Sequence, residues 1–148
     1  MSRTTIADFE KNSIYRIYAV NHIIHGVYSN YFSMTRLKVN TEQFLLLTAL
    51  KYGGPHNQQM LADFIHKDKA TMTRMITKMT ASGLLKRVTD NADKRNNYIE
   101  ITEKGEKTRA ALQKTFKELN DYALRDIPEK ELEKMVDCLF KIEQNLIS

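Results

Sequence analysis

The chain has 148 residues, which fits a single domain and allows a hydrophobic core without disulfides or metal. Apolar residues make up 42% and charged residues 28% of the sequence, and this composition is typical of a soluble globular protein. One cysteine, Cys138, excludes an intramolecular disulfide and a cysteine-based zinc site. No apolar run is long enough to span a membrane and the first residues lack a secretory signal, so we expect a cytoplasmic protein without membrane contact.

The net charge of +5 is concentrated in one segment. Residues 67–95 contain eight basic and three acidic side chains, whereas the rest of the chain is neutral. Positive charge gathered on a neutral body is typical of a surface that binds a polyanion. A solvated basic face is the simpler interpretation if the charge is considered alone.

The N-terminal part of the chain predicts two helices of different character. Residues 6–31 have apolar side chains at helical spacing, too many for one buried stripe, so this helix should have a second apolar partner. Residues 41–51 are apolar on nearly every side, which predicts a buried helix. Asn40 or Thr41 is its expected N-cap, and Gly53-Gly54 should end it.

Two further helices are predicted at residues 57–66 and 69–82, with Asp68 as the N-cap of the second. The buried face of the second helix should consist of Met72, Met75, Ile76 and Met79. Because only about three residues separate these helices, they fit a helix-turn-helix.

The helical spacing of apolar residues then gives way to short runs at residues 85–89 and 97–101, in which alternate side chains would point to opposite faces. These runs predict two strands. The polar segment 90–96 joins them as a hairpin loop. A last pair of helices follows Thr102, which can cap the first of them, and Ile127-Pro128 separates the two. The expected fold class is therefore mainly α (α+β).

The helix at 69–82 has the chemistry of a helix that reads DNA. Thr71, Arg74 and Lys78 share one face, which Thr73 and Thr77 widen. In a helix-turn-helix the second helix enters the major groove, where Arg can bind guanine and Thr can meet a base edge. Lys69 and Lys78 suit phosphate contacts. Taken alone, this segment is more simply read as an ordinary amphipathic helix. The hairpin tip Lys94-Arg95 favours the DNA interpretation, because a basic loop can enter a narrow minor groove.

Several segments together resemble the MarR family of bacterial transcriptional regulators, in register from Asn40 to Gly105. The matching segments are Asn40-Thr41-Glu42-Gln43-Phe44-Leu45-Leu46-Leu47, Leu61-Ala62, Asp68-Lys69-Ala70-Thr71-Met72-Thr73-Arg74-Met75-Ile76, Ser82-Gly83-Leu84-Leu85-Lys86-Arg87, Asp93-Lys94-Arg95 and Ile101-Thr102-Glu103-Lys104-Gly105. The acid-basic-Arg wing followed by a Thr-x-x-Gly helix start is the most specific of these motifs.

The resemblance implies a winged helix-turn-helix lobe at residues 40–105 and a homodimer held by interlocked helices from residues 1–35 and 106–148. It implies that Arg95 enters the minor groove and that Asp93 orients the basic groups around it. It also implies a response to a signal, often a small aromatic acid or an oxidant. Thr77 departs from the family pattern, where an acid is common, so a salt-bridge network is not expected there.

We therefore expect a dimeric, sequence-specific regulator, a repressor, that binds a pseudo-palindromic duplex. The alternative is a protein-interaction module that keeps the fold but leaves its basic patch unused. A third interpretation, a helical metal- or ligand-binding protein, rests on His22 and His25, three residues apart on one helix.

An effector pocket is a further expectation, with Tyr15, Tyr18, His22 and His25 as its candidate residues, although packing at a dimer interface suits the tyrosines better. Cys138 is expected to be a buried structural thiol rather than a redox sensor, because Asp137 beside it disfavours a thiolate. No phosphate loop, nucleophile elbow or metalloprotease helix occurs in the sequence, so we expect no enzyme activity, catalytic residue, metal or cofactor.

Overall fold

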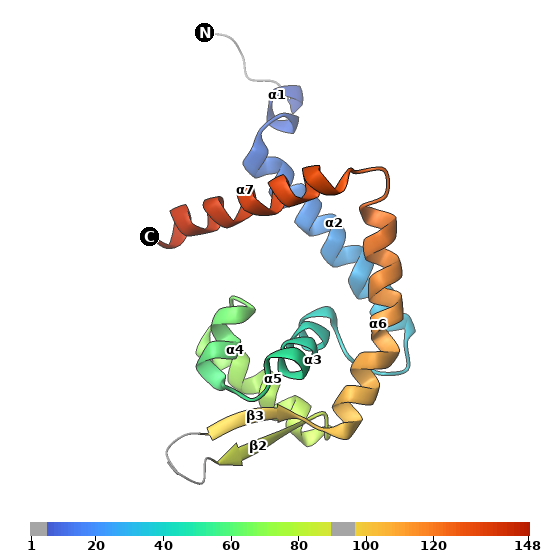
Figure 1. The fold of residues 1–148 in the computed structure, drawn as a ribbon, viewed down its shortest axis with the longest axis vertical. Helices are drawn as coiled ribbons and strands as arrows, with labels where there is room; N and C mark the ends of the chain where they lie inside the picture. Colours follow the sequence, from blue (N-terminus) through green and yellow to red (C-terminus); the bar gives the residue numbers. More distant parts are fainter. Residues whose placement is uncertain (1–5, 90–96) are drawn as a thin grey trace. The chain divides into compact units, whose positions relative to one another are not determined.

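The computed structural model describes residues 6–89 and 97–148 and divides into two compact units, one ending at Phe116 and the other beginning at Lys117 (Figure 1). The elements are α1 (Ile6–Glu10), α2 (Ser13–Met34), α3 (Thr41–Gly53), β1 (His56–Asn57), α4 (Gln58–Phe64), α5 (Lys69–Ala81), β2 (Leu85–Thr89), β3 (Asn97–Ile101), α6 (Glu103–Ala123) and α7 (Glu129–Ile147). The predicted mainly helical fold, a winged helix-turn-helix with a small antiparallel sheet, is confirmed. None of the described helices combines the length and the apolar character that a membrane crossing needs.

The N-terminal segment is two helices, and the prediction of one continuous helix over residues 6–31 is wrong. Asn12 interrupts it: its backbone is extended and its side-chain Oδ1 accepts a hydrogen bond from the Tyr15 N–H at 3.0 Å. An Asn side chain that satisfies a free N–H of the first turn is a strong start signal for a new helix. The apolar spacing continues through this point, which is why the spacing alone conceals the break.

Helix α3 forms the centre of the core. Asn40, one of the two expected N-caps, forms a reciprocal capping box with Gln43, and Gly54 ends the helix at a φ of 79°. Phe44, Leu46, Leu47 and Leu50 are buried on several sides of the helix, as its apolar composition predicts. Phe44 contacts the ring of Phe32 from α2 and the ring of Phe116 from α6, with centroids 5.6 and 4.8 Å apart.

The sheet has three strands in the order β1-β3-β2, and both pairings are antiparallel. Strands β2 and β3 have the predicted bounds, and Figure 1 shows them side by side. The sequence did not predict β1, in which His56 and Asn57 pair with Ile99 and Tyr98. A two-residue strand has no periodicity to detect, and its pairing depends on a partner about forty residues away.

Thr102 and Gly105 join the sheet closely to α6. The Thr102 Oγ1 accepts a hydrogen bond from the Gly105 N–H at 3.0 Å and donates to the Gly83 carbonyl at 2.6 Å. The same hydroxyl therefore caps α6, as predicted, and fastens it to the turn before β2. A Cβ at Gly105 would overlap the Leu84 carbonyl oxygen, so glycine is the residue that permits this approach.

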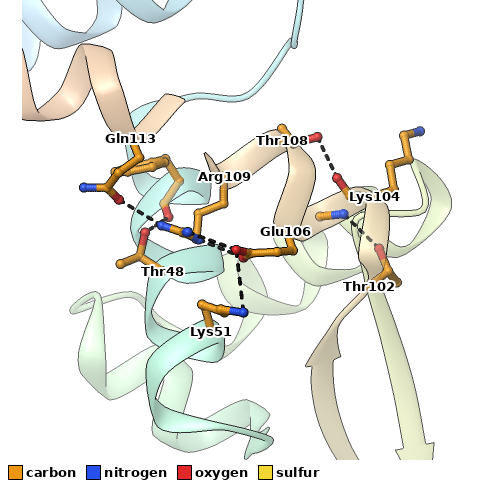
Figure 2. A network of polar contacts seen from close by, with 10 residues as sticks. Thr48, Lys51, Thr102, Lys104, Glu106, Thr108, Arg109 and Gln113 are labelled. Carbon is orange, nitrogen blue, oxygen red and sulfur yellow. Dashed lines mark hydrogen bonds and ion pairs between the residues drawn. The ribbon is translucent and has the colours of Figure 1, made fainter. Parts of the chain in front are cut away.

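A buried arginine connects α6 to α3, as Figure 2 shows. Arg109 Nε and Nη2 donate to the two carboxylate oxygens of Glu106 at 2.8 and 3.0 Å, and Nη1 donates to Gln113 Oε1 at 2.9 Å. From α3, Lys51 Nζ lies 3.6 Å from Glu106 Oε1, and the Tyr52 ring lies 5.4 Å from the guanidinium. The side chain of Arg109 is only 7% exposed, so its charge depends on these partners.

Helix α7 has no buried residue in the single chain. Met135, Val136, Leu139 and Leu146 recur at helical spacing and leave an apolar face in contact with solvent, and Leu132 on the same face is half-buried. Cys138 is exposed as well, so the expectation of a buried thiol is wrong for the single chain. The physical reason is that burial of any residue on α7 requires a surface outside this helix to pack against it.

Candidate nucleic-acid interface

The turn between α4 and α5 is short and well anchored. Asn57 caps α4 by accepting the Met60 N–H at 2.9 Å, and His66 adopts a left-handed φ of 51° after the helix ends. The Lys67 N–H then donates to the Ala62 carbonyl at 2.9 Å, which closes the turn. Lys67 also forms an ion pair with Glu42 of α3 at 2.7 Å. These contacts fix the direction in which α5 leaves the turn.

Helix α5 has one buried and one exposed face. Met72, Ile76 and Met79 are buried at spacings of four and three residues, whereas Met75 is half-buried at the edge. Because the same periodicity places the intervening residues on the outside, the polar face follows directly from the apolar one. The predicted contact residues of this helix are Lys69, Thr71, Thr73, Arg74, Thr77 and Lys78; Thr71 is half-buried and the other five are exposed.

A chain of hydrogen bonds orders the first turn of α5. Asp68 Oδ1 accepts the Thr71 N–H at 2.8 Å, and the Thr71 hydroxyl donates to Asp68 Oδ2 at 2.6 Å. Arg74 Nη2 in turn donates to the Thr71 hydroxyl at 3.1 Å. The hydrogen bonds from Thr71, first from its side chain and then from its backbone, lower the pKa of Asp68. Asp68 therefore stays ionised and holds Thr71, which supports the guanidinium of Arg74.

The hydroxyl of Thr73 is already engaged within the protein. It donates to the Lys69 carbonyl at 2.7 Å and accepts from Gln58 Nε2 of α4 at 2.5 Å. The Thr71 hydroxyl is similarly occupied on both sides, so the methyl groups of these threonines are the parts best suited to touch a base. Gln58 is not predicted as a site residue from the sequence, because its contact with Thr73 joins two helices and no spacing within either helix indicates it.

The other predicted site residues lie elsewhere. Asp93, Lys94 and Arg95 fall in segment 90–96, outside the described residues. Tyr15, Tyr18, His22 and His25 all lie exposed on α2, where the rings of Tyr18 and His22 stack with centroids 6.5 Å apart. In the described parts of the chain, no group of three or more His, Cys, Asp or Glu side chains is placed to hold a metal ion.

The comparisons with known proteins agree with this geometry. The model of the MarR family matches residues 39–96. The structure is similar to a MarR family transcriptional regulator from Silicibacter pomeroyi DSS, with a TM-score of 0.83 and 19% identity over 95% of this chain and 93% of that one. It is also similar to the S. aureus MepR-DNA complex, with a TM-score of 0.81 and 20% identity over 93% of this chain and 98% of that one.

A third similar structure is CouR from Rhodococcus jostii RHA1 bound to p-coumaroyl-CoA, with a TM-score of 0.82 and 19% identity over 90% of this chain and 93% of that one. At these identities the likeness establishes the fold, and the family model adds the sequence pattern of the lobe. Residues 39–96 therefore match the sequence pattern of the MarR family, and the chain has the winged helix-turn-helix fold seen in structures of MarR family transcriptional regulators.

Proposed function

We propose that this protein is a DNA-binding transcriptional regulator that reads duplex DNA with α5. The observation that carries the proposal is the exposed face of α5, where Arg74, Thr77 and Lys78 project from a helix whose opposite face is buried. The MarR family match over residues 39–96 and the likeness to a DNA complex support it. A rigid helix with a basic outer face is suited to the major groove.

The side chains of this face have different tasks in the proposed complex. Arg74, held by Thr71, would bind the O6 and N7 acceptors of a guanine. Lys69 and Lys78, at the two ends of α5, would contact phosphates and so position the helix without reading sequence. The methyl groups of Thr71 and Thr73 would meet thymine methyl groups, because the hydroxyls are bonded within the protein.

The wing supplies the second contact in this proposal. Lys94 and Arg95 at the hairpin tip would enter the minor groove next to the major groove that α5 occupies, and Asp93 would orient them. A narrow A·T-rich minor groove has an enhanced negative potential that favours Arg. This role rests on the resemblance of the segment and on its place in the sequence between β2 and β3, which pair with each other.

We also propose that the chain acts as a homodimer whose operator affinity responds to a small molecule, and that it represses. The exposed apolar face of α7 and the exposed apolar residues of α2 suit a second copy of the chain. Two copies of α5 about 34 Å apart would match successive major grooves of a pseudo-palindromic site. A ligand that changed this separation would lower the population that fits the operator.

Selection of bound fragments from random duplex DNA, followed by affinity measurements at several salt concentrations, tests the proposal. We expect a recovered sequence motif and an affinity that falls steeply with salt. Arg74→Ala should cost about 1–3 kcal/mol on the selected site and less on unrelated DNA. Absence of duplex binding at low salt would reject the function and leave the protein-interaction module as the better account.

Neutralising Lys94 and Arg95 together also distinguishes the DNA-binding regulator from the protein-interaction module. A DNA-binding protein should lose affinity for its selected site, because the wing then brings no positive charge to the minor groove. A protein-interaction module should keep its partner binding unchanged. Duplex binding measured by fluorescence anisotropy, with the melting temperature as the control for folding, distinguishes these outcomes.

A further inference from the structure

A pocket of about 320 Å³ lies beside α5, between the start of two helices and the sheet. Gln58 of α4, Lys69 of α5, Arg87 of β2 and Asn97 of β3 all line it. None of the lining residues is acidic. With Gln59 of α4, the pocket thus collects two cations and three amide side chains from four different elements, and its volume is at the lower end for ligand sites.

The cations that line the pocket are not neutralised by the described parts of the chain. Neither Lys69 nor Arg87 forms an ion pair with a described acid. The neighbouring Lys86, by contrast, is paired with Glu100 at 2.7 Å. Two cations that face the same small pocket repel each other, and an anion between them removes that repulsion.

The register of the hairpin places Arg87 on the pocket side of the sheet. Arg87 lies opposite Ile99, which is buried against the helices and lines the same pocket. Because side chains alternate along a strand, Lys86 and its partner Glu100 point to the other face. Successive basic residues of β2 are therefore separated, one engaged in an ion pair and the other directed to the pocket.

The pocket is connected to the exposed face of α5. Gln58, which lines it, donates to the Thr73 hydroxyl at 2.5 Å, and Lys69 is the first residue of α5. On the sheet side, the Thr89 hydroxyl donates to Asn97 Oδ1 at 3.3 Å, so the amide nitrogen of Asn97 is its atom suited to donate to a ligand. A polyanion that follows α5 would thus reach the pocket without leaving the surface of the lobe.

We infer that this pocket binds one backbone phosphate of the DNA, and this inference rests on the proposed DNA-binding function. Lys69 and Arg87 supply the positive charge, and the guanidinium can hold two phosphate oxygens at once. The amides of Gln58 and Asn97 add neutral donors around the same group. Because a phosphate is present at every nucleotide, this contact sets the position of α5 and wing without selecting a sequence.

The experiment compares Arg87→Gln and Lys69→Gln with the full-length wild-type chain on the selected duplex and on an unrelated duplex. For each variant, the affinity for the selected duplex and the affinity for the unrelated duplex should fall by the same factor. The slope of log affinity against log salt concentration should become less steep by about 0.9 for each copy of the chain bound. Lys86→Gln is the matched control on the same strand, and it should leave the slope unchanged.

The outcomes separate this inference from the proposed function. If the wild-type protein binds duplex DNA and both pocket variants keep its affinity and slope, the inference is wrong and the function stands. A loss confined to the selected duplex, with an unchanged slope, would contradict a phosphate contact in favour of a base contact. If the wild-type protein binds no duplex, both fail. Lys69→Gln, which lies on a helix, keeps the test valid should Arg87→Gln disturb the sheet.

Discussion

Gly105 of α6 packs against the backbone of Leu84 so closely that there is no space for a side chain between them. A Cβ at position 105 would overlap the Leu84 carbonyl oxygen and lie 2.8 Å from Ile101 Cγ1. The Thr-x-x-Gly motif thus has a physical explanation. Thr102 caps the helix and bonds the turn, and Gly105 allows the helix to approach that turn.

Gly105→Ala is expected to destabilise the protein by about 1–3 kcal/mol, because the added methyl group must displace backbone atoms rather than a flexible side chain. Gly26→Ala is the matched control. A Cβ there meets nothing within 4 Å, and alanine in a helix is preferred over glycine by about 0.5–1 kcal/mol. Urea unfolding followed by circular dichroism would measure both changes. Equal stability of the two variants would argue against the close approach.

Glu106→Gln should destabilise the protein by about 1–3 kcal/mol, because it removes the charge that two nitrogens of Arg109 contact. The Glu106 side chain is 30% exposed, so the loss should fall below that of a fully buried ion pair. Glu103→Gln provides the comparison on the same helix. Its ion pair with Lys107 is exposed and should contribute little. Thermal unfolding at neutral pH gives both values.

The same carboxylate predicts a dependence of stability on pH. The hydrogen bonds from Arg109, supported by the charges of Arg109 and Lys51, lower the pKa of Glu106 in the folded protein. Because the folded pKa lies below that of the unfolded chain, the stabilisation is complete above the unfolded pKa and is lost as the pH falls through the folded pKa. Unfolding free energies measured from neutral to acid pH should therefore fall less steeply for Glu106→Gln. If the unfolding free energies of the wild type and of Glu106→Gln fell in parallel with pH, Glu106 would not be a cause of the pH dependence.

Asp68→Ala should lower the melting temperature and the helix content, because the first turn of α5 loses the acceptor of the Thr71 N–H. Asp68→Asn keeps a good cap without the charge, so it should retain most of the stability. Because the pKa of Asp68 is lowered by Thr71, the charge-dependent part of its contribution disappears on acidification and should be absent in Asp68→Asn. If Asp68→Ala and Asp68→Asn had the same melting temperature, the side-chain cap would have no measurable role in stability.

Leu139→Glu should weaken the proposed homodimer, because it puts a charge into the exposed apolar face of α7. Asn145→Glu introduces the same charge away from that face and should leave association unchanged. Sedimentation equilibrium over a range of protein concentrations would give the monomer fraction. A Leu139→Glu protein that associates as the wild type does would exclude α7 from the interface.

Much of the fold could be predicted from the sequence because the signals are local. The buried face of α5 and the bounds of β2 and β3 follow from the periodicity of neighbouring residues. Other features depend on residues far apart in the chain. In the sequence, Arg109 resembles any surface cation on a helix. Only the fold brings Tyr52 beside Arg109 and Lys51 beside Glu106.

In the candidate site, too, the features set by neighbouring residues could be predicted, and those that depend on distant residues could not. The outward face of α5 could be derived from its apolar face, since both belong to one helix. The hydrogen bond from Gln58 to the Thr73 hydroxyl could not be derived from the sequence, because it depends on how two helices pack. The placement of Arg87 and Lys86 on opposite faces of the sheet could not be derived either, because it depends on the strand register. Strand β1 and the break at Asn12 were missed for a further reason: a short element gives too few residues for a pattern.

Strand β2 is an outer strand of the sheet, because β3 lies between it and β1. Such a strand can add a strand from another molecule along its open side and so begin aggregation. Lys86 and Arg87 place a positive charge on each face of β2, and bringing two such strands together would set like charges against each other. Replacing both residues at once would therefore reduce the solubility of the protein. Single substitutions should keep the sheets of neighbouring molecules apart.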